Sequence, residues 1–277
     1  MATPIATRCL LRRPSSLGPP PLLSSPSSSS CGLNRRPSPP LRCSSPPVDA
    51  EAARPGEGGE YQPSFVDDLL LAFFRSKMVE EVGWDSQKPG YAGLMEIVNR
   101  LMIKGKSASE AEQSSVRVLR SLFPPLLLVL YKALLAPIAG GQLASMMLAR
   151  ATALSCQWLM GPCSFNSVTL PDGKSWSSGV FVQKCKYLEE SKCLGICINT
   201  CKLPTQTFFK NHMGVDLYME PNFEDYSCQF NFGVQPPPFD TDKALKEPCL
   251  DICTNARRRR ELGKNGSSPD ELSCPQV

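Results

Sequence analysis

The first part of the chain has the apolar spacing of amphipathic helices. Apolar residues recur every three or four positions in segments 64–83, 91–105 and 107–123. Two of these segments begin with a capping-box pattern, in which Ser64 precedes Asp67 and Ser107 precedes Glu110. The pattern therefore predicts three helices and the starting points of two of them.

A more apolar stretch follows the proline pair at 124–125. The run Leu126–Leu135 holds about ten residues and includes Lys132, whereas a helix that spans a bilayer needs about 20 apolar residues. We therefore predict no transmembrane helix. The run is either a buried helix or a helix that lies on a membrane surface. We favour the buried helix, with segment 122–160 as the apolar wall of a pocket.

After Gly161 the pattern changes to short strands and short helices. Segment 166–185 alternates and turns at 171–173, which predicts a hairpin, and segment 215–233 predicts two strands around an acidic loop. Short helices are predicted at 187–202, 204–214 and 247–260. The predicted fold class is α+β, with an α-helical N-terminal half followed by a Cys-rich half of short strands and helices.

The first 48 residues have the composition of an organelle transit peptide. They contain six Arg, 11 Ser and 11 Pro but no Asp or Glu, and "LRCSSP" resembles a plastid processing site near Ser44. We predict a protein of the plastid stroma. The predicted organisation is a transit peptide (1–48), a disordered linker (49–62), a helical region (63–160), a Cys-rich region (161–256) and a flexible tail (257–277).

Loss of this leader changes the electrostatics. The formal charge falls from +4 to −2, because all six leader charges are basic. The remainder has no basic footprint for nucleic acid, and we interpret the run Arg257–Arg260 as a solvated helix end. Ten cysteines remain, and in a reducing stroma thiols or metal ligands are expected before a disulfide framework.

A single histidine, His212, excludes several enzyme classes. An iron site with two His and one carboxylate needs two imidazoles, and no nucleophile-elbow motif accompanies His212 for a Ser-His-Asp triad. We interpret it as an ordinary surface residue. "PDGKS" lacks the first glycine of a phosphate loop, and Gly140–Gly141 lacks the rest of a dinucleotide fingerprint.

The cysteines are the remaining candidates for chemistry. Cys193, Cys197 and Cys201 recur every four residues, so on a helix they share one face. A single metal ion could use them if the helix ends before Cys201, as Pro204 predicts. A metal site, disulfides and buried free thiols all remain open. Nearby carboxylates that could act as general acids or bases are Glu220 and Asp225.

Residues 150–254 contain five motifs: C-x7-C-x3-C-x3-C, "K-x-P-[ST]-Q", "MEP-x-F", "SC" and "PC-x3-C". In these motifs the segment resembles the plastid β-carotene isomerase family of strigolactone biosynthesis. The resemblance implies a sister branch of that family and an iron-dependent cis/trans isomerase of the all-trans/9-cis β-carotene type. The implied iron is mononuclear or an iron–sulfur cluster, and the implied ligand set is Cys185, Cys193, Cys197, Cys201, Cys228, Cys249 and Cys253, with Glu220 and Asp225 also on the pattern.

This resemblance implies a carotenoid substrate, and peripheral contact with a plastid membrane is a further expectation. Turning a conjugated double bond requires its bond order to fall transiently, and a thiolate-held iron centre can exchange electrons with a polyene. The alternative is a non-catalytic carotenoid- or lipid-binding protein with a structural metal or iron–sulfur site. A thiol-redox protein is disfavoured because no C-x-x-C motif occurs.

Overall fold

The computed structural model describes residues 64–104, 107–250 and 252–253, all of them in the unit 57–277. The predicted transit peptide, linker and C-terminal tail lie outside the described residues, as do Arg257–Arg260.

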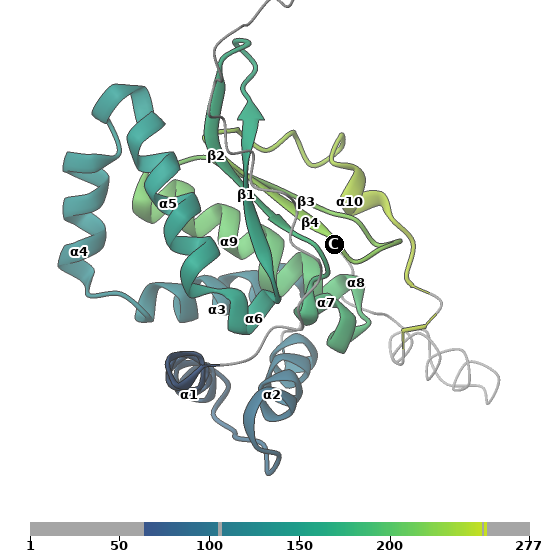
Figure 1. Ribbon diagram of the computed structural model, residues 1–277. Coiled ribbons are helices and arrows are strands. Elements are labelled where there is room, and N and C mark those ends of the chain that lie inside the picture. The colour runs from purple at the N-terminus through teal and green to yellow at the C-terminus, as the bar shows by residue number, and fades with distance from the viewer. Residues whose placement is uncertain (1–63, 105–106, 251, 254–277) are drawn as a thin grey trace, which may run out of the picture. The chain divides into compact units, whose positions relative to one another are not determined.

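The three predicted N-terminal helices are present (Figure 1). Ser64 Oγ accepts the Asp67 N–H, and the Asp67 carboxylate accepts the Ser64 N–H at 2.7 Å. Ser107 Oγ likewise accepts the Glu110 N–H at 3.2 Å. These side chains satisfy backbone donors that have no partner inside the helix, so the predicted starts are confirmed. The helices are α1 (Phe65–Val82), α2 (Gly90–Lys104) and α3 (Ala108–Ser121).

The apolar stretch after α3 forms a helical hairpin that is largely exposed. Over residues 125–141 the exposed fraction is 68% for Leu126 and 62% for Leu134, and only Leu128, Tyr131 and Ala136 are buried. The prediction of a buried helix is therefore wrong, because this helix packs through one narrow side. The second arm of the hairpin packs through five buried residues between Ala144 and Ala153. The elements are α4 (Pro125–Leu130), the π turn η1 (Tyr131–Leu135), the 3-10 turn η2 (Ile138–Gly141), α5 (Gln142–Ser155) and α6 (Gln157–Met160).

Within the described residues, no helix alone combines the length and the apolar composition needed to cross a bilayer. Only α3 taken together with Pro125–Leu135 has both, and the two are bent by 96° at the break between them.

The predicted hairpin and the two later strands form one antiparallel sheet in the order β1-β2-β4-β3. Cys163 and Cys228 both pair with Val182, and Pro221 pairs with Cys228. Because side chains alternate along a strand, Cys228, Phe230 and Phe232 share the buried face. The strands are β1 (Cys163–Thr169), β2 (Ser175–Val182), β3 (Leu217–Pro221) and β4 (Cys228–Phe232).

A second set of helices carries most of the cysteines. The single helix predicted over 187–202 is instead broken at Lys192, which has a left-handed φ of 48°. The next helical run does not stop at Pro204, as predicted, but continues to Met213. A π turn directly before Pro204 is wider than an α turn, which lets the chain pass the proline ring. The elements are α7 (Lys186–Ser191), α8 (Leu194–Ile196), η3 (Cys197–Lys202), α9 (Leu203–Phe208) and η4 (Phe209–Met213).

The predicted C-terminal helix over 247–260 is absent from its described part. A short helix, α10 (Lys243–Lys246), lies just before it and ends at Glu247, whose backbone is extended. An extended conformation is what the residue before a proline prefers, and Pro248 follows.

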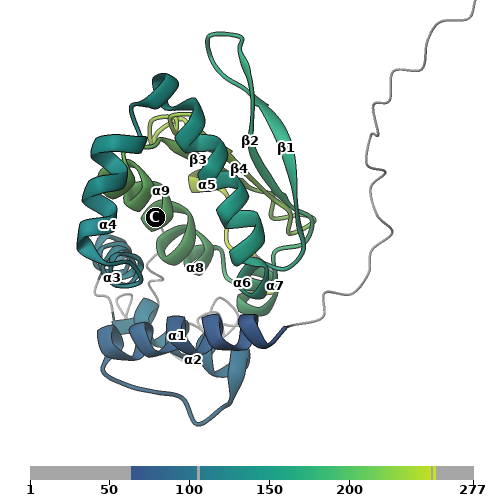
Figure 2. The same ribbon diagram turned by 60° about the vertical axis from the view of Figure 1, so that its left-hand side comes forward.

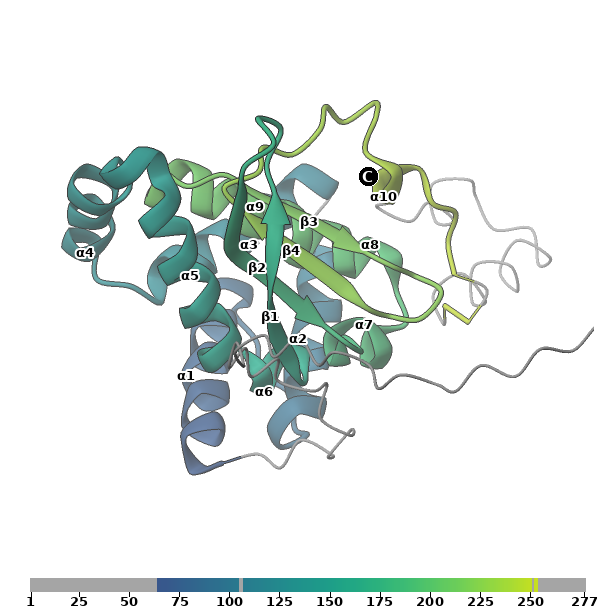
Figure 3. The same ribbon diagram turned by 45° about the horizontal axis from the view of Figure 1, so that its top comes forward.

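Helices cover one face of the sheet, as Figures 2 and 3 show. α5 packs against β2, and η4 packs against β4, where the rings of Phe209 and Phe232 meet edge to face at 5.1 Å. The core lies between these helices and the buried sheet face. This arrangement confirms the α+β fold class, with helices first and the sheet in the Cys-rich half.

Candidate functional site

Four of the seven predicted cysteines surround one small apolar cavity. Cys185 follows β2, Cys197 and Cys201 lie on η3, and Cys228 opens β4. The cavity measures about 10 Å³, roughly the room for a single water molecule. The other lining residues are Met160, Tyr187, Leu188, Lys202, Met219, Pro221 and Phe230. We call the four thiols the cysteine cluster.

Backbone pairing brings the cysteine cluster together. The Cys228 backbone pairs with Val182 at the end of β2, three residues before Cys185. The Cys185 N–H then donates to Tyr226 O at 2.6 Å, which ties the start of α7 to the loop before β4. The positions of Cys185 and Cys228 are therefore set by the sheet rather than by a flexible loop.

A buried ion pair fixes η3, the element that carries Cys197 and Cys201. Lys202 is fully buried, and its Nζ lies 2.6 Å from Asp242 Oδ2 and donates to Met219 O at 2.7 Å. Gln206 Oε1 accepts the Met219 N–H at 2.9 Å. The side chains of Lys202 and Gln206 thus hold β3 against the helical run that carries Cys197 and Cys201.

Sequence analysis missed Lys202, Asp242 and Gln206. The sequence signal that could have found them is a lysine beside Cys201 in an apolar helical segment. A lysine is almost never buried without a partner, so a buried Lys202 indicates a partner elsewhere in the chain. Its partner, 40 residues away at Asp242, has no signal in local spacing.

Burial keeps the cluster thiols protonated when no metal is present. Burial raises the pKa of Cys197 and Cys228 well above its usual range, and neighbouring cysteines raise it further. Burial likewise raises the pKa of Cys185 and Cys201. The ammonium of Lys202 acts in the opposite direction on Cys197 and Cys228. A metal would have to displace these protons to bind.

The donor chemistry fits a soft metal, since four thiols line the cavity and no carboxylate or imidazole does. Among the described residues, however, no three His, Cys, Asp or Glu side chains are grouped closely enough to hold an ion as they stand. The cysteine cluster thus supplies the right atoms, and ligation requires the four thiols to draw together.

The remaining three predicted ligands do not line this cavity. Cys193 is buried before α8, Cys253 is buried near the end of the described chain, and Cys249 is half-buried. Cys193 is separated from Cys197 by a turn of helix that begins afresh after Lys192. The expectation that Cys193, Cys197 and Cys201 share one site, based on their even spacing, is therefore wrong for Cys193.

The two predicted acid/base residues also lie away from the cavity. Glu220 is exposed on the outer face of the sheet, where the Asn231 side-chain amide donates to its carboxylate at 2.6 Å. Asp225 is exposed in the loop before β4 and accepts the Ser227 N–H at 2.8 Å, a bond that lowers its pKa. Neither carboxylate is placed to exchange a proton with a group in the cavity.

His212 lies on η4 and is outside the cavity lining. Burial lowers its pKa, and the charges of Arg120 and Lys132 lower it further. It therefore favours its neutral form and has no role in the cysteine cluster.

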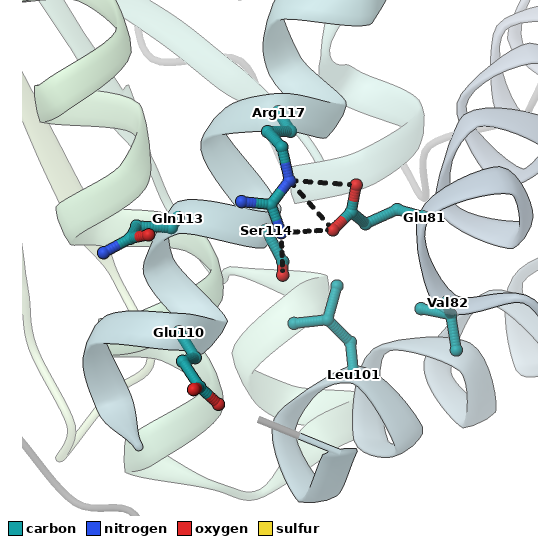
Figure 4. Close-up of a pocket in the computed structure, with 7 residues that line it drawn as sticks. All are labelled: Glu81, Val82, Leu101, Glu110, Gln113, Ser114 and Arg117. Carbon is teal, nitrogen blue, oxygen red and sulfur yellow. Dashed lines mark hydrogen bonds and ion pairs between the residues drawn. The ribbon is translucent and has the colours of Figure 1, made fainter. Parts of the chain in front are cut away.

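Two larger hollows of the described residues are lined by both polar and apolar side chains. One of about 350 Å³ lies between α1, α2 and α3, where Arg117 pairs with Glu81 at 2.5 Å (Figure 4). Another, of about 780 Å³, includes Glu96, Asn99 and Arg100. Segment 122–160 does not wall either hollow; its exposed leucines face outward instead.

Comparison with known proteins connects the cysteine cluster to a family. Residues 158–241 match the family model described as "Beta-carotene isomerase D27-like, C-terminal", a range that contains all four cluster cysteines. A protein of Medicago truncatula named "Beta-carotene isomerase D27, chloroplastic" is 30% identical over 195 residues, which cover 70% of this chain and 75% of the relative.

An Arabidopsis thaliana protein with the same name is 42% identical over 102 residues. That match covers 37% of this chain and 38% of the length of the relative. No solved structure matches the chain.

Proposed function

Because the chain belongs to the D27-like β-carotene isomerase family, we propose that it is a carotenoid cis–trans isomerase of the all-trans/9-cis β-carotene type that feeds strigolactone-type hormone synthesis. Both relatives are named chloroplastic, and the chain is a plastid protein. The observation that carries the proposal is the convergence of four thiols on one apolar cavity within the segment that matches the family.

The lining suits a hydrocarbon substrate. Met160, Leu188 and Phe230 exclude water from the thiols, and a polyene offers no hydrogen bonds for polar groups to satisfy. The cavity has room for one atom, not for a chain of carbons. We place the substrate double bond against the outer side of the lining, where Cys201 and Pro221 are partly exposed.

The cysteine cluster would hold iron, as a mononuclear ion or an iron–sulfur cluster, through Cys185, Cys197, Cys201 and Cys228. When bound, such a centre supplies one-electron exchange, which can lower the order of a conjugated double bond. The protein residues supply position. Lys202 and Asp242 hold η3 against the sheet, and the Tyr187 hydroxyl lies 2.7 Å from Thr200 Oγ1, which joins α7 to η3.

Carotenoids reside in lipid, so we also propose that the enzyme contacts a plastid membrane to obtain its substrate. The exposed apolar hairpin α4–α5 supports this contact.

The test is anaerobic purification of the full chain, metal analysis, and incubation with all-trans and 9-cis β-carotene while the isomer ratio is followed by chromatography. We expect iron with the protein and an isomer ratio that moves with time. Cys197→Ser should abolish both, whereas Cys163→Ser, a half-buried cysteine outside the cavity lining, should retain them.

Two outcomes would contradict the proposal. Stoichiometric carotenoid binding with a constant isomer ratio would indicate a carotenoid-binding protein with a structural site. Full iron content and activity in Cys197→Ser would remove the cysteine cluster from the chemistry.

A further inference from the structure

The hairpin of α4, η1, η2 and α5 presents a surface rich in exposed apolar side chains. α5 packs against the sheet, and α4 lies on the side of α5 that is away from the sheet, at the edge of the described unit (Figures 1 and 3). Nine of the 17 large apolar residues that the described chain exposes belong to this hairpin. We call them the apolar face: Leu126, Leu127, Val129, Leu130, Leu134, Ile138, Leu143, Met147 and Leu154.

The apolar face is held in place from beneath. The buried Tyr131 hydroxyl donates to Ala144 O at 3.0 Å and links η1 to α5. Lys132 Nζ donates to Asn211 O at 2.8 Å and links η1 to η4. Ala139, Gly140 and Gly141 all have positive φ and reverse the chain sharply beside Ile138. The exposed leucines are thus a fixed feature of the fold rather than a frayed segment.

The charge of this region is one-sided. Between Glu112 and Asp172 the chain has no acidic residue, but it has Arg117, Arg120, Lys132 and Arg150. Arg120 and Lys132 both act on His212 of η4, where their charges help to lower its pKa. Arg120, Lys132 and Arg150 are exposed. An apolar surface bordered by exposed cations is complementary to a bilayer with anionic headgroups.

A second exposed apolar strip has the opposite surroundings. α1 exposes Phe65, Val66, Leu69 and Phe73, but its first turn carries Asp67 and Asp68. Carboxylates beside apolar residues oppose approach to an anionic surface. This strip therefore provides an internal control for the contribution of charge.

We propose that the apolar face of the α4–α5 hairpin docks the protein on the surface of an anionic lipid bilayer, with its leucines in the acyl boundary and Arg120, Lys132 and Arg150 at the headgroups. The exposed run of α4 and η1 has about half the roughly 20 residues of a spanning helix. It therefore lies in the interface and does not cross the bilayer.

The experiment is flotation of the full chain with vesicles of phosphatidylcholine alone or of phosphatidylcholine with phosphatidylglycerol. We expect stronger flotation with the anionic vesicles and its loss as salt is added. Leu130→Glu/Leu134→Glu should lower partitioning at least ten-fold. Arg120→Gln/Arg150→Gln should lower it on anionic vesicles by about five-fold for each charge removed.

Leu69→Glu is the matched control, since Leu69 is 60% exposed and Leu134 is 62% exposed. It should float like the unmodified chain. Every variant retains residues 1–48, whose six arginines attract anionic lipid by themselves, so the comparison is between variants.

Two results would overturn the proposal. One is equal flotation of Leu130→Glu/Leu134→Glu and the unmodified chain. The other is a lipid-free dimer that this double variant disperses, which would assign the apolar face to a second copy of the chain. Because binding is measured without carotenoid turnover, either result leaves the proposed isomerase activity to be judged separately.

Discussion

Two apolar helical runs of this protein resemble each other in sequence and differ in surroundings. Leu194–Met213 contains the π turns η3 and η4, and Pro125–Leu135 contains the π turn η1. Lys202 lies on η3, and Lys132 lies on η1. Lys202 is fully buried against Asp242, whereas Lys132 is exposed. The first run lies against the sheet, and the second leaves most of its leucines in solvent.

The difference shows that a covering partner, rather than apolar content, decides whether such a run is core or surface. Leu194–Met213 is enclosed by α3 and the sheet and secured by Lys202 and Gln206. Pro125–Leu135 packs mainly through Leu128 and Tyr131. The buried run positions the cysteine cluster, and the exposed run is left available for lipid.

The largest effect is expected from breaking the ion pair that anchors the buried run. Asp242→Asn keeps the side-chain oxygen that caps α10 but removes the charge that faces Lys202. An unpaired buried ammonium should lower the free energy of unfolding by about 3–5 kcal/mol, measured by urea denaturation. Lys202→Met/Asp242→Asn should recover part of this loss, since no unpaired charge remains.

The exposed Asp240→Asn is the control and should leave the urea midpoint unchanged. A midpoint for Asp242→Asn equal to that of the control would contradict the view that the ion pair anchors η3.

A matched pair of truncations compares the two runs directly. Ile198 is fully buried in the first run, and Leu130 is 45% exposed in the second. Ile198→Ala should cost about 2–5 kcal/mol of unfolding free energy because it opens a cavity. Leu130→Ala should change it by no more than about 0.5 kcal/mol. Thermal and urea unfolding would check both, and similar losses at the two sites would show that the second run is packed after all.

The smallest effect per site is a dependence of stability on pH that arises from buried thiols of the cysteine cluster. Burial raises the pKa of Cys197 and Cys228 above the usual value of 9.0. Below pH 9 the folded and unfolded thiols are both protonated, so stability is unaffected. Above pH 9 the unfolded thiols ionise first, and the chelator-treated protein should lose up to about 1.4 kcal/mol per thiol for each pH unit.

Urea denaturation at a series of pH values from 8 to 10 would measure this loss. Cys197→Ala/Cys228→Ala should flatten the curve, because two of the groups that link folding to pH are gone. An unchanged slope in that variant would show that these thiols do not carry the dependence.

Local patterns predicted the elements well. The capping box at Ser64, the N-cap at Ser107 and the turn at 171–173 are short-range signals, and each is present in the fold. Segment 187–202 failed because a left-handed turn at Lys192 has no strong sequence signal when the residue is not glycine. The proline rule failed at Pro204 because a π turn precedes it.

The site was predictable only in part. Cys185, Cys197, Cys201 and Cys228 line one cavity, although Cys193 and the C-terminal cysteines do not. Their role as metal ligands stays a prediction, because no three ligand side chains of the described residues are close enough to hold an ion as they stand. The outward direction of Glu220 could have been predicted from the sequence. Met219 and Pro221 flank it on a strand and lie on the opposite, buried face, because side chains alternate along a strand. The pairing of Lys202 with Asp242, and the exposure that most leucines of segment 126–135 show within the described residues, depend on tertiary packing that local patterns do not encode.

The bonds that Lys202 and Gln206 make to Met219 also affect how this protein behaves at high concentration. β3 is an edge strand, and an edge strand normally offers free backbone groups to which a strand of another molecule can pair. At Met219 both of these groups are already taken by side chains of the same chain. A strand that adds to this edge would therefore have to break both bonds at Met219, which opposes β-augmentation and aggregation by strand addition there.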